Sequence, residues 1–328
     1  MTGAPVPAGK RRVTACVVGS LNADLILEVQ RLPIEGETVL GTSVQRTHGG
    51  KGHNQAVALR RLGARTSLVG RVGDDPDGRA LRDSLARARV DVAAVSTDAA
   101  LSTGLAVITV DESGRNSICV IPGANGAVTP LAAEQHLRAA APDVVLTQLE
   151  IPVAVAEAAM STGRAESRIT VLNAAPAQRL PGRLLRLADV LVVNEVEAST
   201  LLGLETWPRS EEEQAGVAQR LLDSGPRSVV ITLGDRGCLV IGESGQTRLA
   251  AHSVRVVDTT GAGDCFVAAL ALQLAEGAET RAAAEFASAA AALAVTKRSA
   301  VGGMPTRAEV EHVLTTVPVM ATTSPREG

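Results

Sequence analysis

Between residues 143 and 297 the chain alternates short β-branched segments with longer segments of helical periodicity. This alternation is typical of βαβ units, whose right-handed crossovers place helices on both faces of a parallel sheet. The predicted strands are rich in Val, Ile and Leu, as expected of strands covered on both faces. They are residues 143–147, 168–172, 190–193, 229–232 and 238–241. The sequence therefore predicts an α/β fold with a mostly parallel central sheet.

Residues typical of helix ends support this division. Thr129 followed by Pro130 predicts a helix N-cap and a first helical position. Gly63, Gly203 and Gly277 stand where three helical segments would end. These positions predict helices separated by short connections, as a layered α/β fold requires.

Two segments depart from the βαβ pattern and predict a small additional sheet. Residues 25–48 and 101–123 each contain paired strand-like runs joined by a turn, at Gly36 and at Gly114. We expect the two hairpins to form a β lid beside the core, either over a substrate cleft or as a dimerisation surface. The predicted domains are an αβα core (13–24, 49–100 and 124–317), the lid (25–48 and 101–123) and flexible tails (1–12 and 318–328).

Composition excludes several classes of function. The net charge is −3, so the chain lacks the basic field that nucleic-acid binding needs. No apolar segment is long enough to span a membrane. The four cysteines form no C-x-x-C pair, which predicts reduced thiols and a cytoplasmic location rather than a disulfide framework or a zinc site.

The most informative motif for function is residues 256–264, a loop of small residues followed by an apolar helical run. The backbone N–H groups of Gly261, Ala262 and Gly263 can approach an anion closely, and the helix dipole favours negative charge there. Asp264, in the first turn, can accept a proton from a substrate hydroxyl that attacks a γ-phosphate. The alternative reading is a tight turn with Asp264 as a capping residue.

A second glycine loop, residues 49–58, also runs into a helix. It does not match a P-loop, because Gln45 stands where that motif needs Gly and Gly52 where it needs Ser or Thr. We interpret the loop as a backbone wrapped around a polyhydroxylated ligand, with Lys51 and Asn54 donating hydrogen bonds to its oxygens.

Polar residues also follow the first predicted strand. Asn22 and Asp24 stand where an open α/β sheet usually holds its ligand, and an amide with a carboxylate suits vicinal hydroxyls. An Asx-type turn that closes the strand explains them equally well. A dinucleotide fold is disfavoured, because this first turn lacks G-x-G-x-x-G.

Taken together, residues 49–54, 194–197 and 258–264 resemble the signatures of the PfkB carbohydrate kinase family, its ribokinase branch most closely. The match spans nearly the whole chain. The resemblance implies a three-layer αβα ribokinase-like fold, a nine-stranded type of core sheet, and a β lid that also forms a homodimer contact. It implies transfer of the ATP γ-phosphate to the 5-hydroxyl of D-ribose, with Mg²⁺ and K⁺ as cofactors.

The resemblance also implies roles for individual residues. Asp264 would activate the 5-hydroxyl, beside an anion hole formed by Gly261, Ala262 and Gly263. The sugar would be held by Asn22, Asp24, Gly50, Lys51, Asn54, Glu150 and Asp264. ATP would be held by Asn194, Thr232, Leu233, Gly234, Asp235, Arg236, Gly237, Gly263 and Ser288. Glu197 would organise magnesium through water, and the monovalent cation would lie near Asp258, Thr260, Ala294, Lys297, Ser299 and Gly303.

Three residues depart from the family pattern. His53 replaces a usual small residue, Glu35 a usual Pro, and Gly303 a polar residue near the cation site. His53 either points away from the sugar or reshapes its pocket.

The sequence is also compatible with other functions. Fructose or deoxyribose would suit the same motifs. A nucleoside is disfavoured because the chain has no Tyr, two Phe residues on predicted helices and a single Trp for stacking a base. A non-catalytic sugar-binding regulator would be expected to lose Asp264 or the glycines before it, and both are present.

Overall fold

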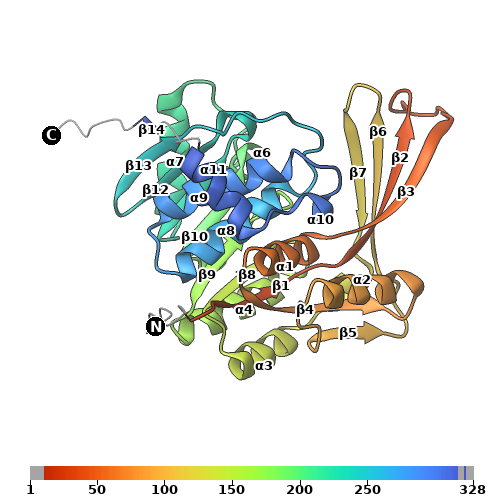
Figure 1. Ribbon diagram of the computed structural model, residues 1–328, viewed down its shortest axis with the longest axis horizontal. Helices are drawn as coiled ribbons and strands as arrows, with labels where there is room; N and C mark the ends of the chain where they lie inside the picture. Colours follow the sequence, from red (N-terminus) through yellow and green to blue (C-terminus); the bar gives the residue numbers. More distant parts are fainter. Residues whose placement is uncertain (1–10, 317–320, 323–328) are drawn as a thin grey trace, which may run out of the picture.

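The computed structural model describes residues 11–316 and 321–322. Its main sheet has ten strands in the order β14-β13-β12-β11-β10-β9-β8-β1-β4-β5 (Figure 1). Neighbouring strands from β11 to β5 pair in parallel, and β11 to β14 pair antiparallel. The strands are β1 Thr14–Val18, β4 Arg65–Gly73, β5 Val95–Asp98, β8 Val144–Thr147, β9 Ile169–Asn173, β10 Val190–Asn194, β11 Ser228–Thr232, β12 Cys238–Gly242, β13 Gly245–Leu249 and β14 Ala321–Thr322.

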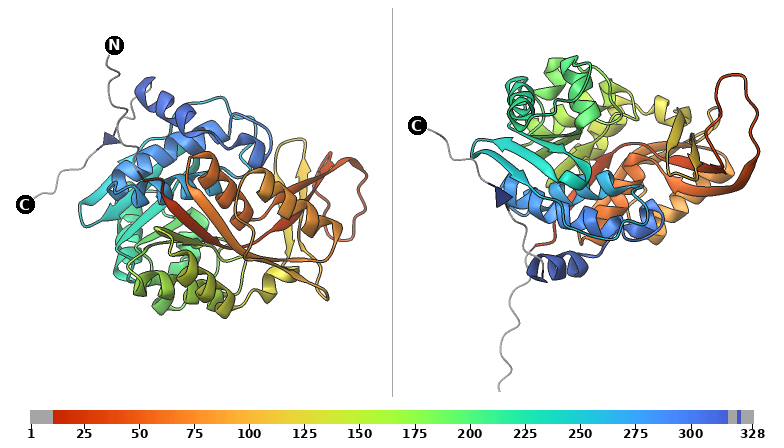
Figure 2. Two further views of the ribbon diagram at one scale, coloured as in Figure 1. Left: turned by 60° about the horizontal axis from the view of Figure 1, so that its bottom comes forward. Right: turned by 90° about the horizontal axis from the view of Figure 1, so that it is seen from above.

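Helices cover both faces of this sheet (Figures 1 and 2). The first layer contains α1 Lys51–Arg61, α2 Pro76–Arg87, α8 Ala262–Ala275, α9 Thr280–Ala294, α10 Ala300–Gly303 and α11 Arg307–Thr316. The second contains α3 Pro130–Ala140, α4 Val153–Ala165, α5 Gly182–Leu185, α6 Glu195–Leu202 and α7 Glu211–Asp223. Two 3₁₀ helices, η1 Gly123–Ala127 and η2 Gly234–Arg236, lie in connections. The architecture is the predicted three-layer αβα fold.

Strand periodicity divides the core between the two layers. In β1, Ala15 and Val17 pack in the cluster that includes α1 and α8, while Cys16 and Val18 pack with α3 and α4. Because both faces of such a strand are buried, its sequence is a continuous run of apolar residues. The positions of these strands could therefore be predicted. The predicted helix ends are also confirmed: the Thr129 side chain accepts the Ala132 N–H at the start of α3, and Gly203 adopts φ 65° after α6.

The second sheet contains four strands in the order β3-β2-β6-β7 and extends beside the body (Figures 1 and 2). Its strands are β2 Asn22–Val29, β3 Gly41–Gly49, β6 Gly104–Asp111 and β7 Asn116–Ile121. The first hairpin of this sheet runs from Asn22 to Gly49, whereas the predicted lid segment was residues 25–48. Asn22 and Asp24 therefore lie on β2 rather than in a loop. Strand β2 pairs in parallel with β6, which joins the two hairpins.

Two details differ from the sequence-based expectations. The main sheet has ten strands rather than nine, because Ala321–Thr322 pairs with β13. These two residues were predicted to lie in a flexible tail; residues 1–10, 317–320 and 323–328 lie outside the described structure. Within the described residues, no helix combines the length and the apolar character needed to cross a bilayer.

The strand order places several polar residues at one edge of the sheet. The carboxyl ends of β8, β9, β10 and β11 meet there, and Gln148, Asn173, Asn194 and Thr232 stand at or just after these ends. This edge is where an open α/β sheet binds its ligands.

Candidate active site

Helix α8 begins at this edge of the sheet. Its N-cap, Gly261, adopts φ 79° and leaves the first N–H groups without a side-chain cap. A Cβ at this position would lie 2.8 Å from the Ala300 Cβ atom, so the loop accommodates glycine for both conformational and steric reasons. The uncapped N–H groups and the helix dipole form a site suited to an anion.

Asp264 lies in the first turn of α8 and is 8% exposed. One carboxylate oxygen accepts a hydrogen bond from Asn54 Nδ2 at 2.9 Å, and the other accepts one from Gln55 Nε2 at 3.1 Å. Burial raises the pKa of Asp264 to about 6, although Lys51 and the Asn54 hydrogen bond favour its ionised form. A carboxylate with this pKa is ionised at neutral pH and is basic enough to accept a proton.

A network of side-chain amides lies behind Asp264 and was not predicted from the sequence. Gln148 Nε2 donates to Gln55 Oε1 at 2.5 Å, and Gln55 Nε2 also donates to Asn173 Oδ1 at 3.1 Å. Gln55 and Gln148 are completely buried. Because Gln148 occupies the Gln55 carbonyl oxygen, the Gln55 amino group is oriented toward Asp264. The only sequence signal was the position of Gln55 in the helix that follows the second glycine loop.

This network yields a testable expectation for Gln55→Ala. Removing the amide deletes one hydrogen bond to the ionised carboxylate, so the pKa of Asp264 should rise and turnover should fall by about 10-fold, the scale of a charge-assisted hydrogen bond. The measurement is the pH profile of kcat/KM, whose acid limb should move to higher pH. A Gln55→Ala variant with unchanged rate and limb would contradict the positioning role; Gln219→Ala on the exposed face of α7 is the matched control.

Lys51 is the first residue of α1 and lies among three carboxylates. Burial opposes its charge, but Asp264, Glu150 and Glu197 outweigh this effect and raise the pKa of Lys51. Its backbone N–H donates to Glu150 Oε2 at 3.0 Å. The ammonium is therefore held charged beside Asp264.

Glu150 also joins the start of β2 to this group. Its Oε2 atom accepts hydrogen bonds from Ser20 Oγ at 2.5 Å and from Asn22 Nδ2 at 3.3 Å. Asn22 Oδ1 in turn accepts a hydrogen bond from Asn125 Nδ2 at 2.7 Å. Asn125, within η1, is a further residue that the site assignment from sequence omitted.

Asp24 is the most perturbed of the predicted sugar ligands. Burial, together with the charges of Glu150 and Asp264, raises the pKa of Asp24 to about 7. All three of these influences disfavour the ionised form of Asp24. A ligand that brings hydroxyl donors to Asp24 would stabilise its ionised form.

A cavity of about 150 Å³ brings Lys51, Asp264 and the start of α8 together. The predicted sugar ligands Asn22, Asp24, Asn54 and Glu150 do not line it. It is bounded by the start of α8 and by the carboxyl ends of β9, β10 and β11. Its lining residues are Lys51, Asn173, Ala175, Val192, Val193, Asn194, Glu197, Thr232, Gly261, Gly263, Asp264 and Val267. A carboxylate base, an ammonium group and helix N–H groups thus face one space, an arrangement that can deprotonate a hydroxyl and stabilise a phosphoryl group.

Asn194 and Glu197 form a capping box at the start of α6. Asn194 Oδ1 accepts the Glu197 N–H at 2.9 Å, and Glu197 Oε2 accepts the Asn194 N–H at 2.8 Å. Burial raises the pKa of Glu197. Its carboxylate lines the cavity and is a hard oxygen ligand of the kind Mg²⁺ prefers. No group of three or more His, Cys, Asp or Glu residues in the described chain is arranged to hold a metal ion.

The predicted monovalent-cation segments lie close together. Asp258 accepts the Thr260 N–H and the Ser299 N–H, each at 2.9 Å. A Cβ at Gly303 would lie 2.6 Å from the Ala294 carbonyl oxygen. The oxygen atoms that these contacts place in the predicted cation segments are those of the Asp258 carboxylate and the Ala294 carbonyl. The Lys297 side chain instead forms an ion pair with Glu309 at 3.1 Å.

Some predicted residues do not reach the cavity with their side chains. Leu233 is buried in the core cluster beside α6 and α7, and Arg236 pairs with Glu195, so these two side chains are engaged elsewhere, whereas Asp235 is exposed. Ser288 is buried on α9 and does not line the cavity. His53 is buried with Nε2 3.2 Å from Ser84 Oγ, which matches the interpretation that it points away from the sugar.

Comparison with known proteins extends these observations. Residues 14–307 match the pfkB family carbohydrate kinase profile. The chain is similar to ribokinase of Bacillus subtilis, with 40% identity over 300 residues that cover 91% of this chain and 98% of the relative. It is 38% identical over 301 residues to bifunctional ribokinase/ribose-5-phosphate isomerase A of Fructilactobacillus sanfranciscensis, covering 91% of this chain but only 55% of that relative.

The structural comparison agrees. The structure of Arabidopsis thaliana ribokinase complexed with ribose and ATP superposes with a TM-score of 0.83 at 31% identity. The similarity covers 92% of this chain and 99% of that one.

Proposed function

Because the chain belongs to the PfkB family of carbohydrate kinases, we propose that it transfers the γ-phosphate of ATP to the 5-hydroxyl of D-ribose. It is a phosphotransferase with an alcohol acceptor. The observation that carries the choice of reaction is the convergence of Asp264, Lys51 and the start of α8 on one cavity. The relatives named ribokinase support the choice of sugar.

In the proposed reaction Asp264 accepts the proton of the 5-hydroxyl as the oxygen attacks the γ-phosphorus. The N–H groups of residues 261–263 stabilise the charge on the transferred phosphoryl group, and Lys51 adds a fixed positive charge. We assign the sugar hydroxyls to Asn22, Asp24, Asn54 and Glu150. Asn22, Asp24 and Asn54 are buried, Asn54 donates a hydrogen bond to Asp264, and the pKa of Asp24 is raised; these observations support the assignment.

For ATP, we propose that Asn194, Thr232 and the backbone of residues 233–237 hold the nucleotide. Glu197 is assigned to water-mediated magnesium binding, supported by its cavity-lining carboxylate. When bound, Mg²⁺ neutralises charge on the ATP phosphates. The chain's own contribution is to keep this carboxylate in place through the capping box with Asn194.

We also assign K⁺ to the loop around Asp258. In wild-type protein, potassium should raise kcat above the value in sodium, because a cation held by Asp258 and neighbouring carbonyls stiffens the loop that leads into Gly261. The expected size is several-fold, measured as ADP release with each chloride salt. Asp258→Asn should remove most of the difference while leaving the protein folded. Equal rates in both salts for wild type would refute the assignment.

The choice of ribose is tested by ADP release with ribose, deoxyribose, fructose and nucleosides. The proposal expects the highest kcat/KM for ribose, since specificity is a ratio of these values. A higher value for fructose or a nucleoside would reject ribose while retaining the kinase.

We further propose a homodimer through the outer face of the small sheet and a cytoplasmic location. Ile118 and Val120 stand two residues apart on β7, so they lie on the same face of this sheet; both are exposed, and pairing would bury them. All four cysteines are free, as in a reducing compartment.

A further inference from the structure

A second and larger cavity, of about 790 Å³, lies at the opposite edge of the main sheet. Ile169, Val190 and Ser228 line it, and they stand at or next to the amino ends of β9, β10 and β11. The proposed catalytic residues lie at the carboxyl ends of the same strands. This basal cavity is therefore separated from the active site by the length of the strands.

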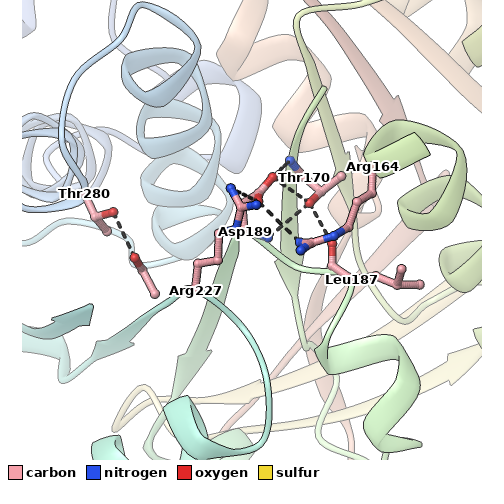
Figure 3. A network of polar contacts seen from close by, with 7 residues as sticks. Arg164, Thr170, Leu187, Asp189, Arg227 and Thr280 are labelled. Atoms are coloured by element: carbon pink, nitrogen blue, oxygen red, sulfur yellow. Dashed lines mark hydrogen bonds and ion pairs between the residues drawn. The ribbon is translucent and has the colours of Figure 1, made fainter. Parts of the chain in front are cut away.

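Three arginines from different segments line the basal cavity. Arg164 is in the last turn of α4, while Arg168 and Arg227 immediately precede β9 and β11. The strand order brings these segments together, because β9 and β11 both flank β10. Figure 3 shows Arg164 and Arg227 on either side of Asp189.

The contacts that Arg164 and Arg227 make with a carboxylate are long. Asp189 uses one oxygen to accept two bonds from Thr170, each at 2.9 Å. Its other oxygen lies 3.5 Å from Arg164 Nη1 and 3.3 Å from Arg227 Nη1, so one oxygen serves two guanidinium groups (Figure 3). These separations exceed the 2.7–2.9 Å typical of strong charge-assisted hydrogen bonds.

Arg168 is the least satisfied of the three. Its nearest carboxylate oxygen, on Glu166, is 3.8 Å from Nη2. Its Nε atom is enclosed and has no acceptor among the described residues. A buried donor without a partner carries a free-energy cost that an incoming acceptor would remove.

The start of helix α9 and residue Glu243 also line the basal cavity. Helix α9 begins there at Thr280, and its N-cap, Glu279, supplies no side-chain hydrogen bond to the first N–H groups. The dipole of this 15-residue helix adds positive potential. Glu243 and Glu279 also line the cavity and supply acceptors for hydroxyl groups.

We propose that the basal cavity binds a phosphate-bearing small molecule, with the phosphate between Arg164, Arg168 and Arg227. Three planar guanidinium groups offer more donors than Asp189 and the distant Glu166 carboxylate can use, whereas a phosphate group accepts from several at once. The cavity is much larger than one phosphate, and the carboxylates of Glu243 and Glu279 suit the hydroxyl groups of an attached polyol.

The test is isothermal titration calorimetry of the full chain with ribose 5-phosphate and, separately, with inorganic phosphate. Arg168→Gln should weaken binding about 10-fold or more, the effect expected for a hydrogen bond to a charged group. Arg138→Gln, which removes an exposed arginine of α3 paired only within its helix, should leave binding unchanged. Because the Arg168 side chain makes only the long contact with Glu166 among the described residues, its replacement should not unfold the protein, which circular dichroism checks.

Asp24→Asn distinguishes this cavity from the active site. If ribose 5-phosphate binding survives Asp24→Asn and is lost in Arg168→Gln, the basal site is supported. The opposite pattern, or no binding of either compound to wild type, would overturn it. Equal affinity for inorganic phosphate would identify free phosphate as the source of the recognised group.

Discussion

We expect Asp264→Asn to lower kcat for ribose phosphorylation by about 10²–10⁴-fold, the usual contribution of a general base. Asn keeps the shape of the side chain and one oxygen acceptor, which either Asn54 or Gln55 can use, but it cannot accept the substrate proton. ATP affinity should change little, because the N–H groups at the start of α8 remain. Single-turnover assays and nucleotide binding measure the two effects separately.

Asp77→Asn is the matched control for this substitution. Asp77 also lies in the first turn of a helix, α2, and pairs with Arg46 at 2.6 Å far along the chain from α8. If Asp264 served only to complement its helix dipole, the two variants would have similar kcat values. Near-normal turnover in Asp264→Asn would reject its role as the base.

The Asp264 carboxylate should also make both kcat/KM and the free energy of unfolding depend on pH. Burial raises the pKa of Asp264 from 3.8 to about 6, so a falling pH protonates it earlier than a free Asp. Only the ionised form accepts a proton, and kcat/KM should therefore fall as the pH drops through about 6. Ionising the buried group also costs folding free energy, a cost that grows between pH 3.8 and about 6. Asp264→Asn should consequently unfold at a higher temperature than wild type at pH 8.

The second large effect concerns Gly261→Ala. The residue adopts φ 79°, and a methyl group there would lie 2.8 Å from Ala300 Cβ and 3.0 Å from Ala300 Cα. The left-handed conformation costs about 1–2 kcal/mol for a residue with a Cβ, and the contact requires the loop to shift. Because this loop aims the first N–H groups of α8, kcat should fall by about 10²–10³-fold, as when an oxyanion donor is lost.

Gly277→Ala is a control that separates the effect of backbone strain from the effect of displacing the N–H groups at the start of α8. Gly277 follows the other end of α8 with φ 91°, and a Cβ there would meet nothing within 4 Å. This variant should lose a similar amount of conformational free energy but retain kcat. Equal kcat values for the two alanine variants would contradict the argument that Gly261 positions the anion-binding groups.

The sequence allowed the strands, helix ends and glycine loops to be predicted because each depends on local chemistry. The βαβ alternation predicted β8 to β11, and Thr129 predicted the start of α3. The hairpin turn at Gly114 was equally predictable from composition, and it adopts φ 80°. These features require only the preferences of neighbouring residues.

The amide network behind Asp264 was not predictable in the same way. Gln55, Gln148 and Asn173 come from α1, the end of β8 and the end of β9, and only the folded sheet brings them together. The same applies to the basal cavity, whose arginines look like ordinary surface residues in the sequence. A motif identifies a segment but not the direction of each side chain. Leu233 and Lys297 were predicted as site residues from their motifs, but the Leu233 side chain is buried in the core and the Lys297 side chain pairs with Glu309.

The central claim is that the ribose 5-hydroxyl and the γ-phosphate meet between Asp264 and the start of α8. A crystal structure with ribose and a non-hydrolysable ATP analogue tests this most directly. We predict a 5-hydroxyl oxygen within about 2.6–3.2 Å of an Asp264 carboxylate oxygen, with the γ-phosphate facing the N–H groups of residues 261–263. A sugar bound with that hydroxyl turned away from Asp264, or a γ-phosphate held elsewhere, would contradict it.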